Sequence, residues 1–574
     1  MIKIKNHKQI NLFDPWEYIS PKRRKMLDES WSGLFQKEVL PSLPIDKVVS
    51  HFHNSFGRPT KELYTVLGVL VLQQAFDLTD METVEQFAFN LQWHYALNIT
   101  EESDSAKYIC PKTLWSMRTM VATDKLDNLI FNDVTGKLAE VFKVNPDTQR
   151  LDSTHIKSNM RRLGRLCIFT ETIHKFLVNL KRGHKELFDT IDQKITDKYL
   201  TEKALGCFSR VKPSDSRKTL NEVSRDLFDL VQQFKGDDEV TPMHSYKQLE
   251  RVLTEQCNLT GSDDNPVEMK PPKQIPSDSL QNPSDADATY SGHKGQGYQV
   301  QIMETYSKEE KGLNLITHVE VEPAHKSDAH ALIPAIESVK ERNLSPKELL
   351  ADSLYGSDDN CQEAKRKDVD LIAPVMGTQK QKGVCLSDFK VSENGLISVC
   401  PQGQNPVKTK RKKNRFTAAF DSQKCQCCPH RSQCPVKKGK KFYYLRYTNK
   451  DLRITQRRAY EETPEFKDRY RWRSGIEGTV SEYDRRTGVK HLRVRGLKAV
   501  RFSAILKALA LNIFRAAALR LALEGKKGPG FATGLVCPRL ISIVKERFSA
   551  FMQIVEKIYN HYMVDYFLNV ILVK

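Results

Sequence analysis

The chain has 574 residues, of which 39% are hydrophobic and 28% are charged, so it can build hydrophobic cores and lacks the composition of a disordered protein. Its length predicts several domains. The 90 Lys and Arg residues outnumber the 71 Asp and Glu residues and give a formal net charge of +19, which favours a polyanionic partner such as nucleic acid. No window approaches the roughly 18 consecutive apolar residues of a membrane span. The first residues also lack a secretion signal, so we expect a cytoplasmic protein without a membrane partner.

The positive charge is concentrated in one part of the chain. Residues 401–450 contain 14 Lys and Arg and a single acid, Asp421, and residues 451–500 contain 13 Lys and Arg and eight acids. Because these two windows hold nearly all of the net charge, one surface and not the whole molecule is expected to face the polyanion. A solvated lysine-rich loop is the alternative interpretation of its most basic run, 408–415.

The N-terminal region, 1–140, is predicted to be helical. LYTVLGVLVLQQAF (63–76) is apolar on most sides, as in a buried helix. Thr79 and Asp80 ahead of Glu82 form a helix-start signal, and Pro111 opens a further helix. These short helices have the proportions of a helix-turn-helix domain that would bind DNA ends, and a plain packing bundle is an equally good interpretation.

Residues 141–375 are predicted to form the first part of an α/β core, a mixed sheet with helices. The predicted order is strand, strand, strand, helix, strand, helix, strand, with extended or helical patterns at 151–154, 297–306, 313–323, 331–342, 347–356 and 369–375. Long amphipathic helices at about 165–260 form an insertion after the first strand, and a linker rich in Pro, Ser, Asp and Asn (258–288) follows them.

A Cys/Lys-rich insertion, 376–450, interrupts this core. A helix is then predicted from about Thr455 to Thr487 within the region 451–500, and apolar helices fill the C-terminal part, 501–574. The chain therefore has an α/β core with two insertions between all-α ends.

Cysteine usage separates that insertion from the rest of the chain. Seven of the 12 Cys are scattered singly, which suits a reducing compartment. In the insertion, four Cys have the spacing of a structural zinc site, with Cys427 and His430 as spare candidates: Cys400, Cys425, Cys428 and Cys434. Free thiols in a loop are the alternative.

Four thiolate ligands would order a segment that has too little apolar mass to fold alone. The lysines of the insertion, including Lys412 and Lys413, would then contact DNA phosphates without reading bases.

Three carboxylates are candidate catalytic residues. Asp152 and Asp352 each end a predicted strand, where open sheets place their sites, although each alone could be a helix N-cap. On the predicted helix, Tyr470, Arg473 and Glu477 share one face at 100° per residue. Glu477 is then either a metal ligand beside a phosphate-binding cation or half of a surface salt bridge.

Four segments carry a resemblance to a known family: 56–99, LDSTHIKSNMRRLGR (151–165), LLADSLYGS (349–357) and the block YRWRSGIEG…VRGLKAVRF (470–517). In this order they resemble the DDE-type bacterial insertion-sequence transposases of the insertion sequence 1182 family. The Tyr-x2-Arg-x3-Glu spacing of the last block is the most specific part. One position departs from the related signature, because Asp484 stands where a Lys is expected seven residues after the Glu.

The resemblance implies a ribonuclease H-like core in which Asp152, Asp352 and Glu477 bind two Mg²⁺ ions, or Mn²⁺. Such a site would hydrolyse a phosphodiester and then transfer the 3′-hydroxyl into target DNA. The implied partners are double-stranded DNA, as terminal inverted repeats and target, and a second copy of the chain in a homodimer. DNA contacts are expected from Tyr470, Arg473, Arg485, Arg486, Arg493 and Arg495. The alternatives are a ribonuclease H-like nuclease without strand transfer and an inactive zinc-containing DNA-binding protein.

Overall fold

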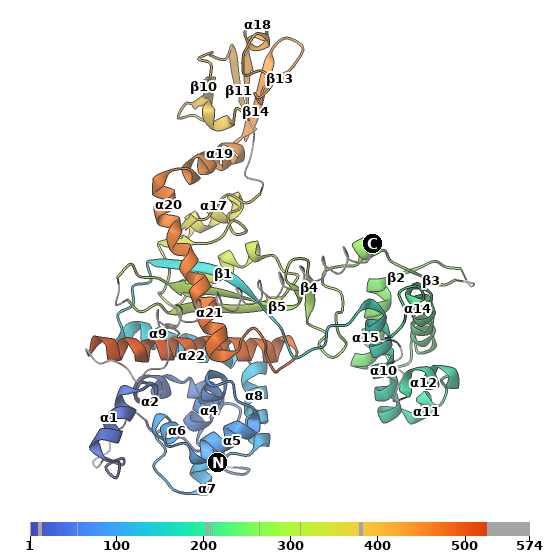
Figure 1. Cartoon of the computed structure of the whole chain (residues 1–574), viewed down its shortest axis with the longest axis vertical. Helices are drawn as coiled ribbons and strands as arrows, with labels where there is room; N and C mark the ends of the chain where they lie inside the picture. Colours follow the sequence, from blue (N-terminus) through green and yellow to red (C-terminus); the bar gives the residue numbers. More distant parts are fainter. Residues whose placement is uncertain are drawn as a thin grey trace, which may run out of the picture. The chain divides into compact units, whose positions relative to one another are not determined.

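The computed structural model describes residues 2–524 apart from 8, 10–13, 54–55, 202–205, 207, 209, 263–264, 310–311 and 378–382. Residues 1–517 form one compact unit and 518–574 a second, and the features below belong to the first, save for the last turns of the final helix. The described chain is about half helical around a mixed β-sheet (Figure 1). The helices predicted beyond residue 524 lie outside the described residues.

The N-terminal region is helical, as predicted. Its helices are α1 (Pro21–Glu29), α2 (Trp31–Leu34), α3 (Ile45–Val49), α4 (Leu63–Ala75), α5 (Asp80–Phe89), α6 (Leu91–Ala96), α7 (Asp104–Lys107), α8 (Pro111–Thr123) and α9 (Leu126–Val141). Almost every residue of α4 is buried. Thr79 caps α5 in a reciprocal capping box with Glu82, and Pro111 is the first residue of α8, so both helix-start signals are confirmed.

The sheet follows the predicted order of elements. It is built from β1 (Thr148–Ile156), β4 (Thr289–Ser291), β5 (Gly295–Thr305), β6 (Ile316–Pro323), β7 (Glu348–Leu350) and β8 (Asp370–Ile372), with α16 (Leu332–Lys340) and α17 (Asp358–Arg366) beside the last two strands. The strand order is β4-β5-β1-β7-β8, and β6 also pairs with β5. β1 is antiparallel to β5 and parallel to β7, so the sheet is mixed.

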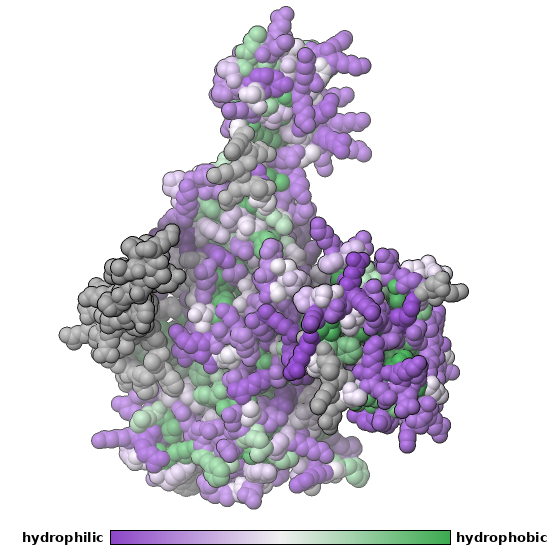
Figure 2. All heavy atoms as spheres, turned by 45° about the vertical axis from the view of Figure 1, so that its right-hand side comes forward, coloured by the Kyte–Doolittle hydropathy of each residue, from purple (hydrophilic) through white to green (hydrophobic). Residues whose placement is uncertain are grey.

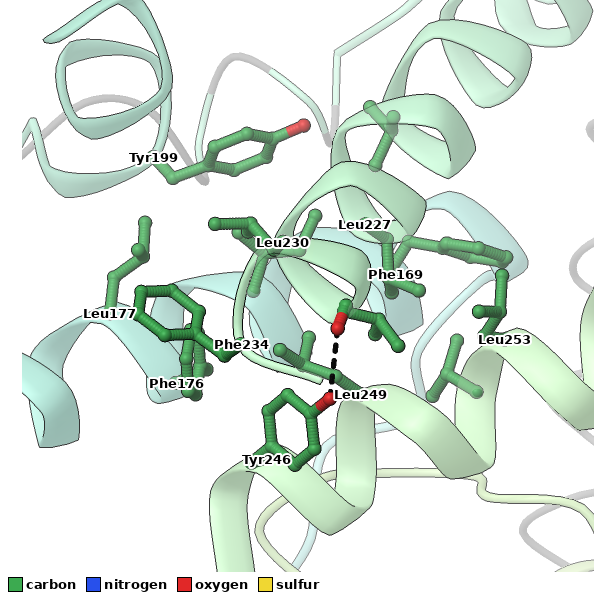
Figure 3. Close-up of a cluster of buried hydrophobic side chains, with 14 of the residues drawn as sticks. Phe169, Phe176, Leu177, Tyr199, Leu227, Leu230, Phe234, Tyr246, Leu249 and Leu253 are labelled. Atoms are coloured by element: carbon green, nitrogen blue, oxygen red, sulfur yellow. Dashed lines mark hydrogen bonds between the residues drawn. The ribbon is translucent and has the colours of Figure 1, made fainter. Parts of the chain in front are cut away.

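The helical insertion forms its own hydrophobic core after β1. It contains α10 (Arg165–Gly183), α11 (Lys185–Phe188), α12 (Gln193–Leu200), α14 (Ser216–Gln233), α15 (His244–Gln256) and the short pair β2 (Cys257–Leu259) and β3 (Val267–Met269). In Figure 3, Phe176 and Phe234 meet between the helices, and the Tyr246 hydroxyl donates to the Val231 carbonyl at 2.8 Å. The polar segment after it is not a free linker, because Leu280, Asn282 and Asp285 are buried.

The Cys/Lys-rich unit (376–450) is a small β structure. Its strands are β9 (Lys390–Val391), β10 (Ile397–Val399), β11 (Lys408–Lys412), β12 (Arg415–Phe420), β13 (Lys437–Lys438) and β14 (Tyr443–Thr448), with the short helix α18 (Ser422–Gln426). Phe389, Phe416, Phe420 and Tyr447 form a buried core. The expectation that this segment has too little apolar mass to fold was therefore wrong, because aromatic residues spaced along its strands meet in one cluster.

The helix predicted from about 455 to 487 is broken. The chain forms α19 (Asn449–Glu461), α20 (Pro464–Tyr470), a 3₁₀ turn (Arg471–Ser474) and α21 (Gly475–Thr487). Pro464 disfavours helical backbone at the residue before it, and Thr463 caps the restart by accepting from the Phe466 amide at 3.2 Å. Gly488 ends α21 with a left-handed φ of 65°, which costs glycine little.

The last described helix, α22 (Leu497–Leu523), is held to the N-terminal region by two ion pairs. Arg501 binds Asp127 at 3.0 Å, and the Lys507 ammonium binds Asp77 at 2.7 Å. By length and composition α22 could cross a membrane, but 78% of its most apolar window is buried, as in a helix of a protein core.

Candidate active site

The register of the sheet brings the first two predicted acids together. β1 pairs in parallel with β7 through Arg150 and Leu350, and Asp152 and Asp352 each lie two residues farther along. Asp352 follows the end of β7, but the prediction that Asp152 ends a strand was wrong, because β1 continues to Ile156 through its pairing with β5. Parallel neighbours therefore deliver both carboxylates to the same edge of the sheet. The Asp352 carboxylate accepts from the Leu354 amide at 2.8 Å, which fixes the turn after β7.

The pKa of Asp152 depends on its burial and on the charged groups around it. Burial raises the pKa of Asp152, and the neighbouring Asp352 carboxylate raises it further. The Arg473 guanidinium and the Lys294 ammonium lower it. The pKa of Tyr470 is also raised by burial, and both aspartates add to that effect. Tyr470 therefore lies near both carboxylates, although the 3₁₀ turn (Arg471–Ser474) interrupts the continuous helix from which its position was predicted.

Arg473 links the third acid to the first. Its Nη2 atom lies 2.7 Å from Asp152 Oδ2, and its Nη1 atom lies 3.1 Å from Glu477 Oε1. Its Nε atom is buried and has no hydrogen-bond partner among the described residues. The predicted contact between Arg473 and Glu477 is thus present, and one guanidinium joins carboxylates from β1 and α21.

A buried ion network holds α21 against the sheet. The Glu304 side chain, on β5, is fully buried; it accepts from Arg150 Nε at 2.6 Å and from the Thr479 hydroxyl at 2.7 Å, and it pairs with Arg515 at 3.1 Å. Arg150 Nη1 also donates to the Trp472 carbonyl at 2.9 Å. Because this network ties β1 and β5 to the start of α21 and to α22, it sets where Glu477 lies.

Gly475 lies against the Arg150 side chain of that network, where a residue with a Cβ atom would clash. A Cβ atom at this position would lie 1.9 Å from Arg150 Nη1, far inside van der Waals contact. No sequence pattern pointed to Glu304, Arg150 or Gly475, although a buried Glu in an alternating strand is an unusual residue to find inside a core.

The donor set suits a hard divalent cation, since all three predicted ligands are carboxylates. Within the described residues, however, no group of three or more His, Cys, Asp and Glu side chains is arranged to hold a metal ion. The Arg473 guanidinium bridges Asp152 and Glu477.

The four predicted zinc ligands gather in one place. Cys400, Cys425, Cys428 and Cys434 line one cavity together with His430. Burial raises the pKa of Cys425 to about 11, and the three other thiols add to that effect. Cys427 is exposed.

The predicted DNA-contacting cations fall into two groups. Lys412 and Lys413 are exposed at the tip of the β11–β12 hairpin, and Arg485 is exposed on α21. The hydrophilic surface of this Cys/Lys-rich unit is visible at the top of Figure 2. Lys413 has a left-handed φ of 51°, which suits the tight turn.

The other cations have protein partners. Arg486 pairs with Glu482 at 2.8 Å, and Arg493 pairs with Asp77 at 3.2 Å. Arg495 donates from Nε to the Asn159 carbonyl. Asp484 also has a structural role, because its carboxylate accepts from the Lys490 amide at 3.0 Å and so caps the turn after α21.

Two family models match parts of the chain. Residues 399–517 match a model described as a transposase DDE domain, and residues 34–120 match one described as a transposase domain, DUF772. No curated protein matches the chain. The first match contains Glu477 and most of the Cys/Lys-rich unit, and Asp152 and Asp352 lie outside both. Together the two matches support a DDE-type transposase, a class of enzyme that cuts DNA and transfers its strands.

Proposed function

We propose that the chain is a transposase of the insertion sequence 1182 family with a ribonuclease H-like core. It would act in the cytoplasm as a homodimer that cleaves double-stranded DNA at the terminal inverted repeats of its own element and joins the freed ends to target DNA. The observation that carries the proposal is the convergence of Asp152 and Arg473 with Glu477, beside Asp352, just past the point where β1 and β7 stop pairing.

Asp152, Asp352 and Glu477 would hold two Mg²⁺ or Mn²⁺ ions. When bound, such ions activate the attacking water or 3′-hydroxyl and stabilise the leaving oxygen. The protein's part is to hold the three carboxylates in place through the Glu304 network. Arg473, within 3.1 Å of two of them, would turn its guanidinium to a DNA phosphate, for which its planar fork is suited. Tyr470 would help to position that phosphate.

The Cys/Lys-rich unit would grip the DNA backbone. Its exposed Lys412 and Lys413 support this role, as does the absence of acids other than Asp421 between residues 401 and 450. Structural zinc held by Cys400, Cys425, Cys428 and Cys434 would brace the unit, and their shared cavity supports this assignment.

The test is cleavage of a supercoiled plasmid that carries the element ends. Asp152→Asn, Asp352→Asn and Glu477→Gln should each lower Mg²⁺-dependent cleavage by more than the roughly 10–100-fold expected of a supporting residue. Asp359→Asn is the matched control, because this exposed aspartate pairs only with Lys450 at 3.2 Å among the described residues. Cleavage at the wild-type rate by the three site variants would exclude the proposal.

Two further measurements separate the alternatives. Joining of a labelled DNA end to a second duplex distinguishes a transposase from a nuclease without strand transfer. Elemental analysis of the purified protein tests the zinc assignment, and a zinc content well below one atom per chain would overturn it without touching the carboxylate site.

A further inference from the structure

The strand that carries Asp152 continues past the sheet into a second pairing. β1 pairs with β7 only up to Arg150, and a parallel bridge then joins Lys157 to His491. Between these points no described strand pairs with the β7-facing edge of β1. From Asp152 to Lys157, over about 16 Å at about 3.3 Å per residue, this edge thus has no strand partner among the described residues, although α21 packs against β1.

Backbone hydrogen bonds hold the distal end of this edge. The Lys157 amide donates to the Lys490 carbonyl and the Leu492 amide to the Lys157 carbonyl, both at 2.9 Å, and the Asn159 amide donates to Val494 at 2.9 Å. We name the paired segments 157–162 and 490–498 the basic ribbon. Main-chain groups therefore fix the pairing of the ribbon.

Most of the lysines and arginines of the ribbon have no salt-bridge partner among the described residues. Arg161 pairs with Glu171 at 3.5 Å and Arg493 with Asp77 at 3.2 Å. In the part of the chain that the structure describes, no carboxylate lies within salt-bridge distance of the others: Lys157, Arg162, Lys490, Arg495 and Lys498.

Two aspartates contact the backbone of the ribbon through their carboxylates. Asp285 is buried, where it accepts from the hydroxyls of Ser158 and Tyr298, each at 2.5 Å, and from the Gly496 amide at 3.2 Å. Asp287 accepts from the Leu497 amide at 2.9 Å. Asp285 therefore braces the ribbon from the protein core, whereas Asp287 is exposed. Five cations of the ribbon still have no salt-bridge partner among the described residues.

The positive charge is continuous with the carboxylate site. Lys294 donates to the Ser153 hydroxyl at 2.9 Å and lies close enough to Asp152 to lower its pKa. His155, two residues farther along β1, has Lys294, Lys157 and Arg162 around it. A track of cations thus runs from the catalytic edge to the ribbon.

We propose that the basic ribbon binds the phosphate backbone of duplex DNA beside the scissile position. The 16 Å from Asp152 corresponds to about five nucleotides at 3.4 Å each. Contacts of this kind position the duplex without reading its sequence. This assignment rests on the proposed function for the location of the scissile phosphate, but the binding itself does not.

The experiment measures binding of a labelled random-sequence duplex to the full chain by fluorescence anisotropy at several NaCl concentrations. The variant is Lys157→Gln with Arg162→Gln and Lys498→Gln. If each cation neutralises one phosphate, the slope of log K against log salt should lose about 0.9 per residue, and affinity at 0.15 M salt should fall on the order of 100-fold. The charge-preserving triple Lys157→Arg, Arg162→Lys and Lys498→Arg should keep the wild-type slope.

The matched control neutralises three exposed lysines of the helical insertion, Lys185, Lys194 and Lys218, and should leave the slope unchanged. Three results would each overturn the assignment. They are a wild-type slope in the ribbon variant, an equal loss of slope in the control, and tighter binding of duplex RNA than of duplex DNA. Unchanged binding together with cleavage that still requires Asp152 would reject the ribbon alone. A lost slope with no cleavage by the wild-type protein would reject the transposase function alone.

Discussion

The carboxylate site and the Cys/Lys-rich unit differ in how their charges are held. The three acids lie at positions 152, 352 and 477, and a fully buried glutamate with buried arginines supports them. The lysines of the other region lie on one contiguous stretch and are exposed on a small aromatic core. Charge in the first region is therefore part of the packing, whereas charge in the second is added to a surface. Substitutions should affect stability in the first and salt-dependent binding in the second.

The largest effect is expected at Glu304, where the buried network is centred. Glu304→Gln would leave the buried Arg150 without a counter-charge, whereas Arg515 would keep Glu482 at 2.9 Å. Leaving one partner of a buried pair uncompensated typically lowers the free energy of unfolding by about 3–5 kcal/mol. Thermal and denaturant unfolding measure this loss. Glu363→Ala is the control, because its exposed pair with Arg366 should contribute less than about 1 kcal/mol. Equal losses in both variants would contradict the assigned role of burial.

A smaller effect is expected at Gly475. In Gly475→Ala the new methyl group would displace the Arg150 guanidinium, and overpacking of this kind costs about 1–3 kcal/mol. Cleavage should fall as well, because α21 carries Glu477. Gly478→Ala, one turn later with open space around it, should instead stabilise the helix by up to about 1 kcal/mol. If both alanines behave alike, the close approach to Arg150 does not matter.

Acidification should destabilise the sheet core through His318. Burial lowers the pKa of this β6 histidine to about 3, whereas an unfolded histidine titrates near 6.5. Between these values the unfolded chain binds one more proton than the folded chain. The free energy of unfolding should therefore decrease as the pH decreases, by up to about 1.4 kcal/mol per pH unit. His318→Gln should flatten this dependence, and exposed His244→Gln should not. Unfolding midpoints of the wild type and both variants, measured between pH 4 and 7, test this expectation.

The smallest effect on stability is expected at the hairpin tip. Lys412→Gln with Lys413→Gln removes two exposed charges and should change the free energy of unfolding by no more than about 0.5 kcal/mol. The salt slope of duplex binding should still fall by about 1.8, at 0.9 per phosphate contact. A large loss of stability, or an unchanged slope, would remove the contrast between the two regions.

Much of the fold could be predicted because its signals are local. The capping box at Thr79 and Glu82, the alternating strands around 300 and 320, and the amphipathic insertion all follow from residues close together in the chain. Pro464 is a local signal for the break in the helix predicted from about 455 to 487, but the prediction followed the periodic pattern instead. The core of the Cys/Lys-rich unit could not be predicted from its charge, because its aromatic residues meet only once the strands pair.

The sequence by itself determined which residues are chemically suited to a metal-dependent cleavage of DNA: two aspartates in or just after predicted strands, a glutamate one helical turn after an arginine, and a surplus of lysines in one stretch. Only the tertiary structure decided how they are used. The parallel register of β1 and β7 sets Asp152 beside Asp352, Glu304 ties α21 to the sheet, and backbone pairing joins residues 157 and 491. These contacts join positions far apart in the chain, and their energies come from burial and pairing that exist only after folding.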